Sequence, residues 1–163
     1  MADYKITTDL LSPATKKTLE YNGYHPSKII KMMSDIIKNT LKVEGGGVFE
    51  DKIKWDVSGD PVSFYGEWRG KSGFDGRSSA VFKINVQGSQ GAKDKMGKVK
   101  IGISGTLETK FPFTTPFHRS AVWLYMYAFY NKQRREYLEA GKIIADRIEG
   151  EIRSAFNLIQ RER

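Results

Sequence analysis

Residues 48–113 decide the fold of this chain, and they read VFEDKIKWDVSGDPVSFYGEWRGKSGFDGRSSAVFKINVQGSQGAKDKMGKVKIGISGTLETKFPF. Apolar and aromatic side chains alternate with polar ones in four segments, which turn-forming and glycine-rich sequence interrupts at residues 58–61, 70–76 and 88–97. Alternation with a period of two is typical of strands that have one buried and one exposed face. The stretch therefore predicts four strands of an antiparallel meander, with one apolar, buried face and one polar, solvent-exposed face.

Helical sequence flanks the predicted meander on both sides. Pro26 is typical of the first turn of a helix, and Ile and Met recur at helical spacing from there to about Val43. The glycines at 45–47 are expected to end this helix. Beyond the meander, Thr115 and Pro116 have the residue types of a helix start. A long C-terminal helix, or a pair of helices, is predicted from there onward.

Residues 1–163 are predicted to form a single α+β domain. We expect an antiparallel meander sheet of four to five strands, with one face covered by the N-terminal helix and the long C-terminal helix. The candidate fifth strand covers residues 4–11. Residues 13–19 read as a helical turn, and the chain is expected to break at Asn22 and Gly23.

Composition narrows the class of protein. The chain carries 27 Lys and Arg residues against 19 Asp and Glu, so its net charge is +8, and a basic domain attracts polyanions. It has no cysteine, which excludes disulfides and thiolate metal sites and fits a reducing compartment. No apolar run approaches the roughly 20 residues needed to cross a bilayer, and the first residues lack a signal-peptide pattern. We therefore expect a cytoplasmic protein.

No motif has the spacing of a catalytic or metal site. His25 and His118 have no partner at a familiar triad or ligand spacing. The segment 66–72, GEWRGKS, has two glycines and a lysine like a phosphate-binding loop, but it leads into a strand and one residue is missing between the glycines. The carboxylates fall on the wet face or in turns, where they are usually solvated. We expect a protein that is not an enzyme and that uses no cofactor and no metal.

The polar face of the predicted meander carries more basic than acidic side chains. Lysines on such a face, with a tyrosine as a stacking platform, are typical of a surface that contacts phosphate backbones. The alternative is that these lysines only keep an exposed sheet in solution. The leading prediction is that the chain binds a polyanion, RNA or a ribonucleoprotein, through a basic sheet face and a Lys/Gly-rich hairpin loop. The predicted nucleic-acid-binding residues are Lys52, Lys54, Tyr65, Arg69, Lys83, Lys93, Lys95, Lys98 and Lys100.

The segment 122–130, VWLYMYAFY, is apolar or aromatic on all sides of the predicted helix. A helix that packs on a sheet needs only one apolar stripe. Either the domain buries this helix on several sides, or it exposes a patch for a partner. In the second case the chain is a homo-oligomer that assembles through Trp123, Tyr127 and Tyr130.

The glycine-broken meander, its long fourth strand and the helix from Pro116 onward resemble the helix-grip layout of START and Bet v 1-like proteins. The resemblance is one of architecture, because the sequence contains no family motif. It implies a curved sheet wrapped around a long C-terminal helix, often with an apolar small molecule or lipid bound between them. On this alternative reading a cavity is lined by Trp55, Phe64, Trp68, Phe82, Phe111 and Tyr137, unless these side chains fill the space themselves.

Overall fold

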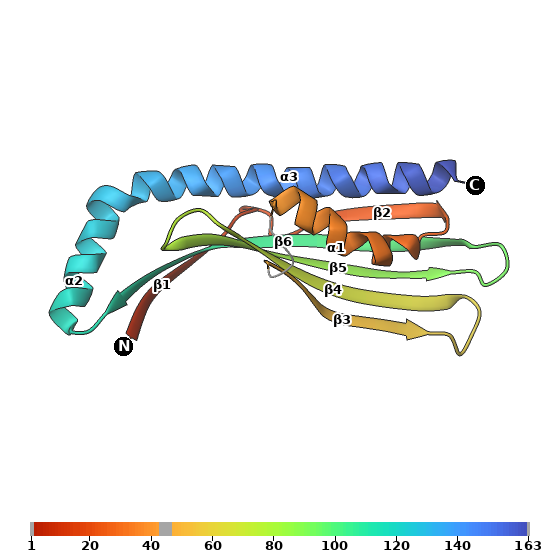
Figure 1. Cartoon of the computed structure of the whole chain (residues 1–163), viewed down its shortest axis with the longest axis horizontal. Coiled ribbons are helices and arrows are strands. Elements are labelled where there is room, and N and C mark those ends of the chain that lie inside the picture. Colours follow the sequence, from red (N-terminus) through yellow and green to blue (C-terminus); the bar gives the residue numbers. More distant parts are fainter. Residues whose placement is uncertain (1, 43–46, 163) are drawn as a thin grey trace.

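The computed structural model describes residues 2–42 and 47–162. An antiparallel sheet of six strands carries a short helix and a long C-terminal helix on one of its faces (Figure 1). The predicted α+β class and the predicted layout are therefore confirmed. The sheet has one strand more than the upper limit of the prediction.

The predicted meander is present, and its strands are longer than the sequence pattern indicated. The order across the sheet is β1-β6-β5-β4-β3, and β2 also pairs with β6. Glycines near 70–76 and 88–97, which were predicted to interrupt the strands, mostly lie within them. The strands are β1 (Ala2–Asp9), β2 (Lys17–Tyr24), β3 (Val48–Asp56), β4 (Val62–Gly73), β5 (Ser78–Gln90) and β6 (Met96–Phe113).

The strand that the prediction missed is β2, because a helical turn was expected over residues 13–19. Its apolar side chains alternate: Leu19 lies opposite Ile101 of β6, and Tyr21 lies opposite Val99. β1 pairs with the far half of the same strand, from Thr106 onward. Strands β1 and β2 therefore share one edge of β6, which is 18 residues long.

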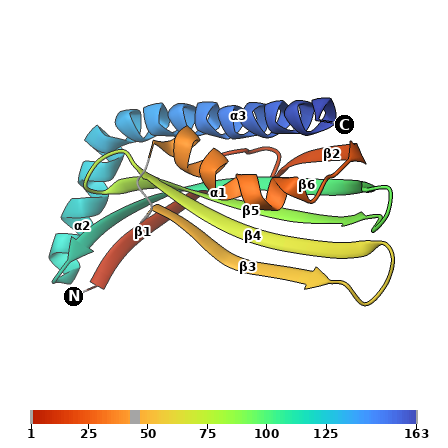
Figure 2. The ribbon, with the colours of Figure 1, turned by 45° about the vertical axis from the view of Figure 1, so that its right-hand side comes forward.

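The helices are α1 (Lys28–Leu41), α2 (Pro116–Tyr125), the π-helical turn η2 (Met126–Tyr130) and α3 (Asn131–Arg161). Figures 1 and 2 show α3 running along the sheet with α1 beside it on the same face. α1 ends with Lys42 in a left-handed conformation, with φ of 54°. The predicted glycine stop falls mainly on residues 43–46, which lie outside the described residues.

The core lies between the inner face of the sheet and the two helices that cover it. Inward side chains of β4, β5 and β6 meet the apolar stripes of α1 and α3, and burial of such side chains is the main favourable term in folding. The largest fully buried side chains are Leu10, Ile29, Met33, Ile37, Trp68, Phe82, Ile84, Ile101, Ile103, Leu107, Ile148 and Ile152.

The edge strand β3 departs from the predicted alternation. A register shift between Glu50 and Lys52 makes a β-bulge, so Phe49 and Trp55 lie on opposite faces of the sheet. α1 contacts this strand through Ser34, which donates a hydrogen bond to Glu50 at 2.7 Å, but Trp55 remains 46% exposed beside Phe64. The predicted cavity residue Trp55 thus lies half exposed on an edge strand of the sheet and is not buried between sheet and helix.

Leu10 connects the sheet to the long helix. Its side chain is fully buried and lies between Gly105 of β6 and Gly141 of α3. A Cβ atom placed on Gly141 would lie 2.5 Å from Cδ2 of Leu10, which is too close for a non-bonded contact. α3 continues without a break through Gly141 and Gly150.

Alanine at these two glycines is expected to change the free energy of unfolding in opposite directions. Gly150→Ala places its methyl group in open space and gains the helix propensity of alanine, which stabilises by about 0.5–1 kcal/mol. Gly141→Ala forces its methyl group against Leu10 and is expected to destabilise by about 1–3 kcal/mol. Urea unfolding followed by circular dichroism measures both changes. An equal stabilisation by both substitutions would show that Leu10 is not held against α3.

Candidate functional site

The outer face of the sheet, turned away from the helices, carries the predicted cationic residues in rows across neighbouring strands. In one row Lys54 lies opposite Tyr65, and Tyr65 lies opposite Gln87. Gln87 in turn lies opposite Lys100, and Lys100 lies opposite Glu20 of β2. Neighbouring strands are about 4.8 Å apart, so the row from Lys54 to Lys100 is about 14 Å wide.

Other predicted residues occupy rows on either side. Arg69 lies opposite Lys83, and Lys52 lies opposite Glu67. Lys98 follows on β6, two residues before Lys100 and on the same face. The structure thus brings seven of the nine predicted side chains onto one surface, which we call the outer cationic face: Lys52, Lys54, Tyr65, Arg69, Lys83, Lys98 and Lys100.

The other two predicted residues lie at the end of this face. Lys93 and Lys95 are exposed in the turn that joins β5 to β6. The turn is shorter than the predicted loop, and Lys95 has a positive φ of 59° in it. Backbone contacts hold the turn, because the His25 N–H donates to the carbonyl oxygen of Lys95 at 2.6 Å. The Ala92 N–H donates to the Asp60 carboxylate at 3.1 Å, which joins this turn to the neighbouring β3–β4 turn.

Most of these cations have no carboxylate partner in the described part of the chain. Arg69 is the exception, with its guanidinium 3.3 Å from the Asp51 carboxylate and stacked on Phe49. The Tyr65 hydroxyl donates a hydrogen bond to Glu67, and this bond raises the pKa of Tyr65. Among residues 2–42 and 47–162, no ion pair involves Lys52, Lys54, Lys83, Lys93, Lys95, Lys98 or Lys100.

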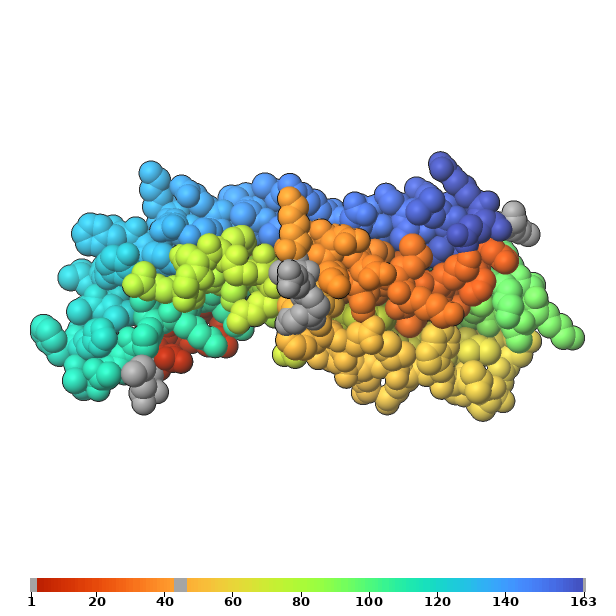
Figure 3. Space-filling model, viewed as in Figure 1, coloured from red at the N-terminus to blue at the C-terminus, as the bar shows by residue number. Residues whose placement is uncertain are grey.

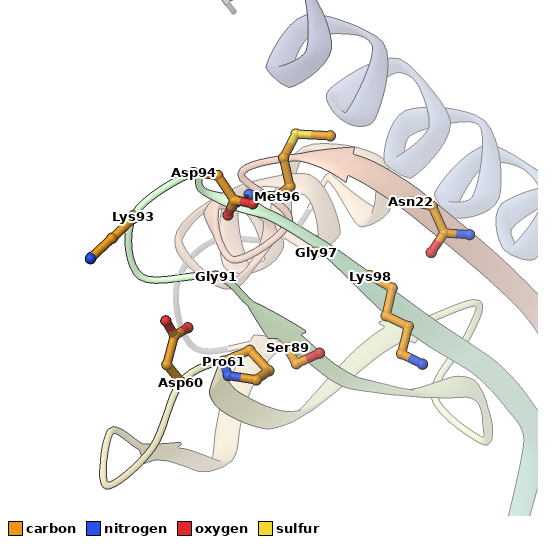
Figure 4. Close-up of a pocket in the computed structure, with 10 residues that line it drawn as sticks. All are labelled: Asn22, Asp60, Pro61, Ser89, Gly91, Lys93, Asp94, Met96, Gly97 and Lys98. Carbon is orange, nitrogen blue, oxygen red and sulfur yellow. Dashed lines mark hydrogen bonds between the residues drawn. The ribbon is translucent and has the colours of Figure 1, made fainter.

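Two adjoining hollows open beside the lysines of β6. The first has a volume of about 470 Å³, and its lining includes Glu20, Gln87 and Lys100. The second has a volume of about 570 Å³ and lies between the two turns at this end of the sheet (Figure 4). The residues common to both hollows are Asn22, Ser89 and Lys98.

The sequence prediction omits the contribution of β2 to this surface. Glu20 and Asn22 line the first hollow, and they reach it because β2 pairs with β6. The signal that could have identified them is the alternation of Leu19 and Tyr21 with Glu20 and Asn22. This alternation was obscured by the Asn22-Gly23 pair, because Asn-Gly is typical of turns.

The remaining five side chains of the predicted cavity are divided between two clusters. Phe64, Trp68 and Phe82 are buried in the main core against α1 and α3. Phe111 belongs to a second cluster near the bend between α2 and α3, and Tyr137 packs against both clusters. The structure thus distributes these five residues over two packed clusters, and none of them lines either hollow beside β6.

The helix from residue 116 to 130, comprising α2 and η2, forms an arm that leaves the axis of α3 at one end of the molecule (Figure 1). Its buried side chains, Val122, Met126 and Tyr130, pack on Phe111 and are spaced four residues apart. Such a spacing drifts by about 40° per step around an α-helix. The wider π turn at η2 compensates for part of this drift and keeps the three side chains on the side that faces the sheet.

Two of the three predicted oligomer-interface residues are exposed on the arm, and one is not. Trp123 and Tyr127 stack with their ring centroids 5.6 Å apart and face solvent. Tyr130 is only 2% exposed, so its assignment to an interface is wrong. The π turn directs its ring into the second cluster and its hydroxyl toward the β4–β5 turn.

Asp75, in that turn, holds the arm through a polar network. Its carboxylate accepts hydrogen bonds from the Tyr130 hydroxyl at 2.6 Å and from the Tyr137 hydroxyl at 3.0 Å. It also accepts from the backbone N–H groups of Arg77 and Ser78, each at 2.7 Å. Burial, and then the bond to Asp75, raise the pKa of Tyr130 to about 12, so its hydroxyl remains a donor at neutral pH.

The same network continues to a buried arginine of α3. Ser78 Oγ lies 2.8 Å from both the Tyr130 hydroxyl and Thr109 Oγ1. Arg134 is 8% exposed and donates to Thr109 at 3.2 Å and to Thr8 of β1 at 2.6 Å. This network joins α3, the strands β1 and β6, and the β4–β5 turn at the point where the arm meets α3.

Within the described ranges, no group of three or more His, Asp or Glu side chains could hold a metal ion. No helix in the part of the chain that the structure describes is long and apolar enough to cross a membrane.

Comparison with known proteins gives structural likeness but no family. No protein-family model matches the chain, and no curated protein matches it. One similar solved structure is a protein of unknown function, SA2116 from Staphylococcus aureus, with 10% identity, coverage of 95% of this chain and 98% of that one, and a TM-score of 0.26. Another is Ara h 8.0201, a Bet v 1-like allergen, with 15% identity, coverage of 85% and 97%, and a TM-score of 0.23.

The Asp75 network predicts a loss of stability in acid. Partial burial raises the pKa of the Asp75 carboxyl, but its four hydrogen bonds outweigh burial and hold the pKa below its ordinary value. The resulting stabilisation is present above the unfolded-state pKa of about 3.9 and is lost as the pH falls through the folded-state pKa. Asp75→Asn should therefore be less stable than the native chain by about 1 kcal/mol at pH 7, and the difference should disappear in acid.

Urea unfolding of both proteins between neutral pH and pH of about 3 measures this difference. Asp35→Asn, which removes an exposed carboxylate of α1 that makes no ion pair in the described chain, is the matched control. A difference between Asp75→Asn and the native chain that stays constant at every pH would contradict the assignment.

Proposed function

We propose that this chain is a non-enzymatic binding module whose outer cationic face contacts the phosphate backbone of RNA. The observation that carries the proposal is the set of seven lysines without a carboxylate partner in the described chain, five on this face and two on the adjoining turn. Ion pairs elsewhere in the described residues engage Lys5, Lys17, Lys28 and Lys142. Lysines free of internal partners are available to phosphate, which supplies most of the affinity in such complexes.

The hollow beside β6 supports RNA in particular. Asn22, Gln87 and Ser89 place amide and hydroxyl groups next to Lys98 and Lys100. Such groups both donate and accept hydrogen bonds, as the ribose 2′-hydroxyl does, and this hydroxyl is what distinguishes RNA from DNA at a given site.

Recognition on this face is expected to be independent of base sequence. Tyr65 is the one aromatic side chain among the predicted contacts, and its hydroxyl is held by Glu67. A sheet that reads single-stranded RNA by sequence usually stacks two or three bases on aromatic rings. Backbone contacts therefore dominate in the proposed complex.

The first test is the salt dependence of binding to a fluorescently labelled single-stranded RNA, measured by polarisation. The logarithm of the association constant should fall with the logarithm of salt concentration, with a slope of about −0.7 for each phosphate contact. Four contacts would give a slope of about −3. A slope near zero would contradict the proposal, and equal affinity for DNA of the same sequence would remove the role of the 2′-hydroxyl.

Charge-matched variants separate the outer cationic face from net charge. Lys98→Gln with Lys100→Gln should reduce the magnitude of the salt slope by about 1.4 and weaken binding about tenfold or more. Lys31→Gln with Lys38→Gln removes the same charge from exposed positions of α1, in the helical layer, and should leave the slope unchanged. An equal effect of the two double variants would show that total charge, and not this face, determines binding.

A further inference from the structure

The arm carries an exposed aromatic surface that the proposed function does not use. The arm lies at one end of an elongated molecule (Figure 3), and several of its apolar and aromatic side chains are exposed. Phe117 is 85% exposed, Phe129 is 73% exposed and Tyr127 is 69% exposed. We call the exposed apolar and aromatic side chains of the arm, taken together, the aromatic arm face: Phe117, Trp123, Leu124, Tyr125, Tyr127 and Phe129.

The arm is held firmly, so this exposure is not the result of a helix that lacks attachment. Val122, Met126 and Tyr130 are buried on its other side. The guanidinium of Arg77 lies 5.0 Å from the ring centre of Phe111 and 5.7 Å from that of Tyr125, which joins the arm to the β4–β5 turn. The aromatic rings are therefore presented to solvent on a fixed support.

The segment that contains the arm carries charge of a single sign. From Thr109 to Arg135 the sequence contains no Asp and no Glu. Arg119, Lys132 and Arg135 are exposed, and none of them makes an ion pair in the described chain. The surface is thus apolar and aromatic with a cationic border.

Exposed aromatic side chains beside cations that make no ion pair in the described chain favour an anionic membrane over a second copy of the chain as the partner of this surface. A second copy of the chain, packed by two-fold symmetry, would bring two sets of these cations together, and like charges across an interface oppose association. An anionic bilayer satisfies both features, because Trp and Tyr favour the headgroup boundary and Lys and Arg are attracted to acidic lipids. One side of the arm is buried against the protein and its other, aromatic side faces solvent, so the arm can lie in the plane of a membrane while it stays attached to the domain.

We propose that the aromatic arm face docks on an anionic lipid surface. The aromatic rings enter the headgroup region, and Arg119, Lys132 and Arg135 contact lipid phosphates and carboxylates. The arm lies on the membrane and does not cross it. The outer cationic face, on another part of the molecule, takes no part in this contact. Lipid binding by the arm and RNA binding by the outer cationic face can therefore be tested independently of each other.

The test is sedimentation of the full chain with vesicles of phosphatidylcholine, with and without about one-third phosphatidylserine. The chain should bind the anionic vesicles and not the neutral ones. Trp123→Ser should reduce the partition coefficient by roughly an order of magnitude. Trp55→Ser, which removes the other exposed tryptophan of the described chain, should leave it unchanged.

Two further variants identify the face that binds. Lys132→Gln with Arg135→Gln should weaken vesicle binding roughly tenfold or more, whereas Lys98→Gln with Lys100→Gln should not change it. Failure to bind anionic vesicles would overturn the proposal. Vesicle binding lost through Lys98 and Lys100 but unaffected by Trp123→Ser would also overturn it. A dimer that Trp123→Ser converts to a monomer, without vesicle binding, would overturn it in favour of a second copy.

Discussion

Pairing of β6 on both of its edges is the constraint on which the rest of the structure depends. One edge pairs with β5 along its length, and the other is divided between β1 and β2. The segment between β1 and β2 carries Leu10 across the inner face to the position where Gly105 and Gly141 leave room for it. The long helix α3 can then lie close to the sheet, and the apolar faces of both are removed from water.

This arrangement separates the buried core from the surfaces on which we propose binding. The large aromatic rings of β4 and β5 are buried in the core between sheet and helix, where they contribute to stability. Lysines on the opposite face of the same strands have no internal partners in the described chain and remain available to an external anion. The arm, which extends beyond the main core, is buried on one side only and leaves its other aromatic side chains in solvent.

Much of the fold and part of the site were predictable from local pattern. Alternation predicted β3 to β6 and assigned Lys98 and Lys100 to the same face, since side chains two apart on a strand point the same way. It failed at the bulge beside Asp51, where one extra residue reverses the alternation and separates Phe49 from Trp55. It also missed β2, because the polar turn residues around Asn22 conceal a short alternating strand.

The sequence by itself determined the meander, the helices that flank it, and the side of each central strand that faces water, because these follow from periodicity within a few neighbouring residues. Only the tertiary structure decided that β1 and β2 share one edge of β6, and that Tyr130 is buried while Trp123, on the same arm, is exposed. These outcomes depend on contacts between distant segments: Tyr130 reaches Asp75 from 55 positions along the chain. Such contacts come from the packing of whole layers, which no local pattern of residues specifies.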